Sequence, residues 1–168
     1  KAGAGAAIGK TIRPVKSASH RIGTGEAQID EVLLQDTAGR LLKSVDFDQD
    51  VCISVRLTAR TQCRPSVVGY IIRDHYGVDL LGTNTAVEDM DLPELEEGEK
   101  CSVDFRMRLP LLMGSYSITA AVGHDLDRPL FYDWWDNAYV FEVTPPLNRK
   151  IVNCKLHLPI KVDIRKGI

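Results

Sequence analysis

The chain has 168 residues, a formal net charge of −2 and 44% hydrophobic residues, a composition typical of one globular domain. A chain of this length can bury a core without a metal or a disulfide. The near-neutral charge and the lack of a long basic run argue against nucleic acid as a partner, and no apolar run is long enough to predict a transmembrane helix. Residues 1–10 are rich in Gly and Ala and lack the apolar centre of a signal peptide.

The first stretch contains a near match to a phosphate-binding loop, Ala4-Gly-Ala-Ala-Ile-Gly-Lys-Thr11, in which Ala4 replaces the first glycine. Such a loop must follow a buried strand and open a helix, so that backbone N–H groups converge on the phosphate. Only three residues precede this one, and Pro14 follows it closely. We therefore interpret residues 1–20 as a linker or tail.

From Gly23 onward the pattern predicts β-strands. In residues 51–59, apolar and polar side chains alternate, as expected for a strand with one buried face. Turn residues at 36–39 and 74–77 separate neighbouring runs, and a long loop is predicted from Asp125 to Trp135. The predicted strands span 27–35, 51–59, 66–73, 78–85, 100–108, 116–123 and 138–143.

Seven short strands without a helical period predict an all-β fold, a two-sheet antiparallel β-sandwich over residues 21–144. Thr144-Pro145-Pro146 then breaks the sheet, and residues 145–168 form a stiff linker plus a strand-like run, 155–164. In this run apolar residues alternate with polar ones, and Pro159 confines it to a sheet edge. It can be exchanged with a second subunit or can fold back onto its own sandwich.

The cysteines at positions 52, 63, 101 and 154 form no Cys-x-x-Cys pair, and no His lies at metal-ligand spacing from them. Their even number permits two disulfides, but their spread favours reduced, structural cysteines in a cytosolic chain. No nucleophile motif is present, and we expect no enzyme. The alternative is a glycan-modifying enzyme that uses Asp125, Asp127, Asp133 and Asp136 as paired carboxylates, although Asp clusters more often form turns.

A binding module is better supported. Outward-facing arginines on two strands, Arg56 with Arg106 and Arg108, could grip hydroxyls, carboxylates or phosphates. Residue parity from Phe141 backwards places Trp135 in the core and Trp134 outside, where its ring could pack on a sugar. A bulge at Asp136-Asn137 would exchange the two tryptophans. The candidate carbohydrate contacts are Arg56, Tyr70, Arg73, Arg106, Arg108, Thr119, His124 and Trp134.

Three segments together resemble one protein family. They are Arg21-Ile-Gly-Thr-Gly-Glu-Ala-Gln-Ile29, Ile72-Arg-Asp-His-Tyr-Gly-Val78 with Gly82-Thr-Asn-Thr85, and Tyr132-Asp-Trp-Trp-Asp-Asn-Ala138. This combination resembles the C-terminal carbohydrate-binding domain of Wzt-type proteins, the ATP-binding subunits of ABC transporters that export O-antigen polysaccharide. The resemblance covers about residues 21–143, with a weaker match through the C-terminal strand.

The resemblance implies an immunoglobulin-like sandwich without catalysis, which recognises the O-antigen polysaccharide, including a modification at its non-reducing end. It implies a homodimer with exchanged C-terminal strands, at the cytoplasmic face of the inner membrane together with a transmembrane subunit. It implies no cofactor for this domain, because ATP is bound by a separate nucleotide-binding domain. We expect the chain to be the C-terminal domain with part of its linker. The alternative is a structural dimerisation domain without glycan contact.

Overall fold

The computed structural model describes residues 20–125, 130–145 and 153–166. This part of the chain forms nine β-strands and contains no helix, so no helix in it could cross a membrane. The strands are β1 (Arg21–Ile22), β2 (Ala27–Gln35), β3 (Ser44–Asp46), β4 (Gln49–Ala59), β5 (Val67–Asp74), β6 (Asp79–Asn84), β7 (Lys100–Leu109), β8 (Gly114–Asp125) and β9 (Leu130–Thr144).

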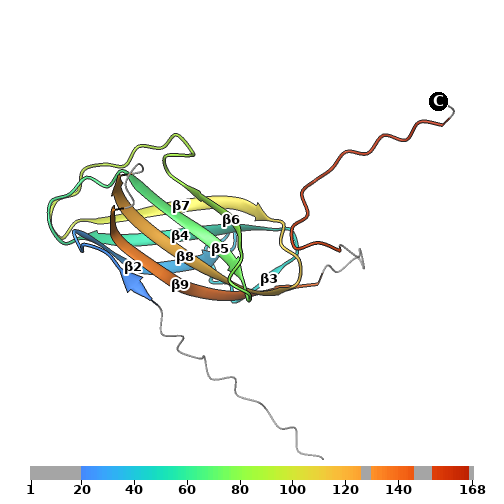
Figure 1. Cartoon of the computed structure of the whole chain (residues 1–168), viewed down its shortest axis with the longest axis horizontal. Coiled ribbons are helices and arrows are strands. Elements are labelled where there is room, and N and C mark those ends of the chain that lie inside the picture. Colours follow the sequence, from blue (N-terminus) through green and yellow to red (C-terminus); the bar gives the residue numbers. More distant parts are fainter. Residues whose placement is uncertain (1–19, 126–129, 146–152, 167–168) are drawn as a thin grey trace, which may run out of the picture.

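The strands form two sheets that pack face to face as the layers of a sandwich (Figure 1). The three-strand sheet has the order β2–β4–β7. The six-strand sheet has the order β1–β9–β8–β5–β6, with β3 also paired to β9. All pairs are antiparallel except β3–β9, which is parallel. The predicted antiparallel β-sandwich is therefore confirmed.

The core lies between the sheets and is built from the alternating residues that the sequence pattern marks. Ile53 and Val55 of β4 and Ile118 of β8 are fully buried. Phe141 of β9 is only 1% exposed. Their sequence neighbours on each strand point to the outer face, because successive side chains of a strand alternate. A slip of one residue in the pairing would move these apolar side chains out of the core, so their burial fixes the register of each strand.

Two predicted turns are stabilised in the same way, by an aspartate side chain that accepts hydrogen bonds from backbone N–H groups. Asp36 accepts hydrogen bonds from the backbone N–H groups of Ala38 and Arg40, each at 2.9 Å. Asp74 accepts equivalent bonds in the turn between β5 and β6. Each turn ends in a glycine with a positive φ of 81°, a conformation that costs glycine little. The Asp-x-x-Gly sequences therefore form tight turns by the mechanism that their composition indicates.

The predicted loop from Asp125 to Trp135 is wrong in most of its length, because β9 begins at Leu130. This segment pairs with β8, with Leu130 opposite Asp125 and Trp134 opposite Ala121. Long-range pairing thus overrides the turn preference of its aspartates. The short strands β1 and β3 were not predicted, since they exist only through their pairing with β9.

The predicted strand over residues 155–164 does not form a sheet strand in the single chain. Its only bridge among the described residues joins Leu156 to Leu111, and the rest extends away from the sandwich (Figure 1). The predicted linker at residues 1–20, apart from His20, lies outside the described residues. So do the phosphate-loop-like sequence, Asp127 and Pro146.

Candidate functional site

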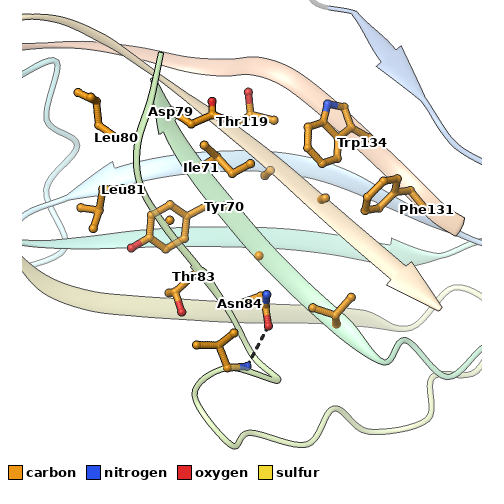
Figure 2. Close-up of a pocket in the computed structure, with 16 residues that line it drawn as sticks. Tyr70, Ile71, Asp79, Leu80, Leu81, Thr83, Asn84, Thr119, Phe131 and Trp134 are labelled. Carbon is orange, nitrogen blue, oxygen red and sulfur yellow. Dashed lines mark hydrogen bonds between the residues drawn. The ribbon is translucent and has the colours of Figure 1, made fainter. Parts of the chain in front are cut away.

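A groove of about 580 Å³ lies on the outer face of the six-strand sheet. Strands β5, β6, β8 and β9 contribute to it (Figure 2). Its volume falls within the range of ordinary small-ligand pockets. Figure 2 shows Trp134 and Phe131 together on one side, Leu80 on the other, and Ile71 between them. We refer to this hollow as the groove.

The floor of the groove is low because two of its residues have no side chain. A Cβ at Gly82 would lie 2.7 Å from the carbonyl oxygen of Tyr70, and a Cβ at Gly69 would lie 2.7 Å from the Cβ of Asn84. Both distances are shorter than any normal contact, so the close approach of β5 and β6 requires glycine at both positions. Ala121 on β8 continues this floor with a small side chain.

The aromatic wall comes from the start of β9. Trp134 lines the groove, and Phe131 packs against it with ring centroids 4.9 Å apart. Trp135 packs against the core on the opposite face and carries the Arg21 guanidinium 4.5 Å above its ring. The predicted orientation of the two tryptophans is confirmed.

An irregularity does occur at the position where a bulge could have exchanged the tryptophans. Tyr139 pairs with Ile118, and Trp135 pairs with Ala120, so β9 has two more residues than β8 in this interval. Two extra residues preserve the alternation of faces, whereas one would reverse it. Asn137 takes a positive φ of 51° within this irregularity.

One end of the groove is polar. Asp136 accepts hydrogen bonds from the indole Nε1 of Trp134 at 2.9 Å, from Arg73 at 2.8 Å and from the hydroxyl of Thr119 at 3.3 Å. Arg73 also pairs with Asp79, which lines the groove. These bonds fix the indole plane at the groove wall.

Asp136 and Arg73 of this network have shifted pKa values. Burial by itself raises the pKa of Asp136, but the hydrogen bonds from Trp134 and Arg73 act in the opposite direction and together hold it below its ordinary value. The hydrogen bond to Asp79 is the largest cause that raises the pKa of Arg73. Both shifts favour the charged forms of Asp136 and Arg73, which stabilises the ion pair between them.

The structure brings together three of the predicted contact residues, Arg73, Thr119 and Trp134. It separates them from Arg56, Arg106 and Arg108, which lie on the outer face of the three-strand sheet. Each of these three arginines is paired with a carboxylate, and the partners are Glu31, Asp104 and Asp48 respectively. These ion pairs lie on the other sheet from Trp134, so the structure does not bring the three arginines together with it.

Tyr70 and His124 occupy other positions. The Tyr70 side chain is buried in the core, where its ring packs on Phe105 with centroids 5.0 Å apart and its hydroxyl donates to the sulfur of Met107 at 3.2 Å. Burial raises the pKa of Tyr70 to about 12. His124 is exposed and bonds the Tyr132 hydroxyl through Nδ1 at 3.0 Å. Neither the His124 imidazole nor the Tyr70 phenol bonds to the Asp136 network.

The carboxylates of the alternative enzyme site have structural partners. Asp133 is buried and binds the Arg21 guanidinium and the backbone N–H of Ile29, the latter at 2.7 Å. Asp136 belongs to the groove network, Asp127 lies outside the described residues, and nothing is described of the Asp125 side chain. The described residues contain no cluster of His, Cys, Asp and Glu suited to a metal, and all four cysteines are free.

Sequence reasoning missed the groove floor and the role of Asp136. Gly69 and Gly82 interrupt two strand patterns, and a glycine inside a strand is a known sign of close backbone approach. That signal could have located the groove. Nothing local in the sequence shows that Asp136 bonds Arg73, since the two lie 63 positions apart.

The fold and the groove define a class: a β-sandwich domain with a shallow groove, walled by aromatic side chains, on one sheet face. The family model of the Wzt C-terminal domain matches residues 18–154, so the chain belongs to the Wzt C-terminal domain family. This domain is an accessory part of O-antigen ABC transporters and is not a known catalytic domain.

One of the similar solved structures supports the fold. A crystal structure of the C-terminal domain of Wzt superimposes with a TM-score of 0.68 at 19% identity, covering 84% of this chain and 90% of that chain. The CARDB domain of a Pyrococcus furiosus protein gives a TM-score of 0.44 at 12% identity, covering 73% and 93% of the two chains. A Niemann-Pick type C2 protein from the Japanese carpenter ant gives 0.44 at 8%, covering 74% and 98%. Among curated proteins, no sequence matches this chain.

Proposed function

We propose that the chain is a non-catalytic module that binds O-antigen polysaccharide in the groove for export. The observation that carries this proposal is the groove itself. Its bare floor at Gly69 and Gly82 gives access to a ring-shaped ligand, and the indole of Trp134 is held beside it by Asp136. An aromatic face beside hydrogen-bonding groups is the arrangement that suits a sugar. The family membership supports the ligand class.

In this proposal ATP is bound elsewhere in the transporter, and the module works at the cytoplasmic face of the membrane beside the ATP-binding and transmembrane parts. The domain needs no cofactor of its own for this role. The groove carries the ligand contacts, and the arginine-bearing face of the three-strand sheet carries none of them. Of the predicted sugar contacts, the proposal keeps Arg73, Thr119 and Trp134 and omits Arg56, Arg106 and Arg108.

The proposal is tested by titrating the chain with purified O-antigen polysaccharide while the backbone amides are followed by NMR. We expect shifts at Gly69, Gly82 and the Trp134 indole, and their loss in Trp134→Ala. Arg106→Ala is the matched control on the opposite sheet and should bind normally. Shifts confined to the three-strand sheet, or normal binding by Trp134→Ala, would refute the groove as the site.

A second function is favoured by the C-terminal segment: we propose that it joins two copies of the chain by strand exchange. Residues 158–164 carry an apolar row that is 57–92% exposed and contacts no sheet in the single chain. An exposed apolar row of this length is normally covered by another surface. The row consists of Leu158, Ile160, Val162 and Ile164.

The bridge between Leu111 and Leu156 sets the register in which the apolar row would pair with a neighbouring strand. Leu112 N donates to Lys155 O at 3.0 Å, and His157 N donates to Pro110 O at 2.9 Å. This pattern places Leu156 opposite Leu111 on the side of β7 that β4 does not use. If exchange keeps the register of this bridge, residues 158, 160, 162 and 164 of one copy lie opposite Leu109, Met107, Phe105 and Val103 of the other copy.

The facing residues of β7 suit this register. Val103, Phe105 and Met107 belong to the core face but remain half-buried, because β7 is an edge strand. An added strand would cover them with the apolar row and pair the free backbone groups of the edge. Pro159 lacks the N–H that would bond Arg108 O, and Pro110 lacks the N–H that would bond His157 O, so two hydrogen bonds of the ladder stay unmade.

A disulfide crosslink distinguishes exchange of the C-terminal strand between two copies from fold-back of the strand onto its own copy. Met107→Cys and Ile160→Cys, combined with Cys154→Ser, place two thiols in a pair whose Cβ atoms approach to about 4.5–5.5 Å. Mild oxidation should give a covalent dimer if the strand is exchanged and a covalent monomer if it folds back. A monomer by light scattering for the unmodified chain, or a covalent monomer in the crosslink, would refute exchange.

A further inference from the structure

The charges around the groove indicate which kind of sugar it accepts. At one end, Asp79 and Asp136 share the single guanidinium of Arg73. At the other end, Thr83 lines the groove and its hydroxyl donates to Glu88 at 2.6 Å. Figure 2 shows Asp79 and Thr83 at opposite ends of the hollow. The charged groups therefore give both ends of the groove a net negative charge.

Arg73 is already engaged by its carboxylate partners. Its Nε donates to Asp79, and its Nη1 donates to Asp136 at 2.8 Å and reaches the Thr119 hydroxyl at 3.4 Å. A phosphate gains most from an arginine when the planar fork is presented to it in bidentate fashion. Here the two carboxylates occupy that fork, and they would repel a phosphate brought close to it.

The middle of the groove is apolar. Ile71 lies between Leu80 and the aromatic pair Phe131 and Trp134, and all four side chains line the groove (Figure 2). Water released from such a surface favours a ligand that places an apolar group there. A hydroxyl or a charged group in the same place would lose hydration without a partner.

We infer that the groove selects a neutral sugar residue that carries an apolar substituent, such as a deoxy-sugar methyl, an O-methyl or an acyl group, and rejects phosphorylated and carboxylated residues. This selectivity rests on the proposed function of the groove as the glycan site. The polar network at Asp136 orients the sugar hydroxyls, and the two carboxylates beside Arg73 determine the charge selectivity.

The probes are methyl glycosides of the manno, gluco and galacto series, each with a methyl, a hydroxymethyl or a phosphorylated hydroxymethyl group at C5. They are titrated into the full chain, and the Gly69, Gly82 and Trp134 indole signals are followed by NMR. In at least one series the 6-deoxy form should bind most tightly and the phosphate at least about tenfold more weakly. Asp79→Asn should narrow that difference by raising affinity for the phosphate.

Asp104→Asn is the matched control, because it removes the same charge from the outer face of the other sheet. It should leave all affinities unchanged. If the 6-phosphates bind as tightly as the 6-deoxy sugars, or if Asp79→Asn leaves the phosphate affinity unaltered, the charge selectivity is refuted while the groove remains a sugar site. If no glycoside of any series shifts the groove signals at millimolar concentration, both the selectivity and the assignment of the groove fail.

Discussion

Asp133 provides the sharpest test of how the groove wall is held in place. It is a buried carboxylate on β9 that binds Arg21 of β1 and the backbone N–H of Ile29 in β2. Asp133→Ala would leave the Ile29 N–H buried without a partner, at a cost of about 1–3 kcal/mol. It would also remove an ion pair whose arginine is 31% exposed, so solvent screening limits that loss to about 1 kcal/mol.

The expected decrease in the free energy of unfolding is therefore about 2–4 kcal/mol. Urea denaturation at one fixed protein concentration measures it, because a dimer would make the midpoint concentration-dependent. Asp104→Ala is the control, since its pair with Arg106 is exposed and should contribute less than about 1 kcal/mol. A loss for Asp133→Ala no larger than that of the control would refute the anchoring role.

Three further outcomes are expected. Gly82→Ala places its Cβ 2.7 Å from the Tyr70 carbonyl oxygen and should cost about 1–3 kcal/mol in thermal unfolding, so an unchanged midpoint would contradict the tight floor. Burial raises the pKa of Tyr70 to about 12, so the folded state keeps its phenol neutral at a pH where the unfolded chain, with a pKa of about 10, ionises. The free energy of unfolding should therefore be highest below about pH 10 and should fall as the pH rises towards 12. An ultraviolet titration in which every tyrosine ionises by about pH 10 would disprove this. Cys154 is exposed while Cys52 is buried, so a thiol reagent should label Cys154 first, and Cys154→Ser should remove the fast phase.

The strands of the core could be predicted because their signal is local. The alternation in residues 51–59 reports two faces of one strand, and β2 begins and ends at the residues that the pattern gave. The first part of β9 carried no such signal. Its Asp residues favour turns locally, and only the pairing with β8 makes Leu130–Asp136 a strand.

The grouping of the candidate site residues could be predicted only in part, and the reason is physical. Alternation shows that Arg56 and Arg106 point outward, but it does not show from which of the two sheets. It also does not show that Glu31 and Asp104 lie close enough to neutralise them. Trp134 was placed correctly because parity survives the two extra residues in β9. Arg73 and Thr119 converge on Asp136 only through the order of strands in the sheet.

The groove and the free edge of β7 belong to different sheets, yet one residue touches both. The backbone of Tyr70 belongs to the groove, while its ring packs on Phe105 and its hydroxyl reaches Met107 at the β7 edge. A strand added to that edge would cover Phe105 and Met107, which would hold the Tyr70 ring beneath the groove floor more firmly. A variant of the C-terminal segment such as Ile160→Asp should therefore be measured for both oligomeric state and glycan affinity. Residue 160 is not among the residues that line the groove, so weaker binding in such a variant would be an indirect effect, and Tyr70 is the contact through which we expect it to act.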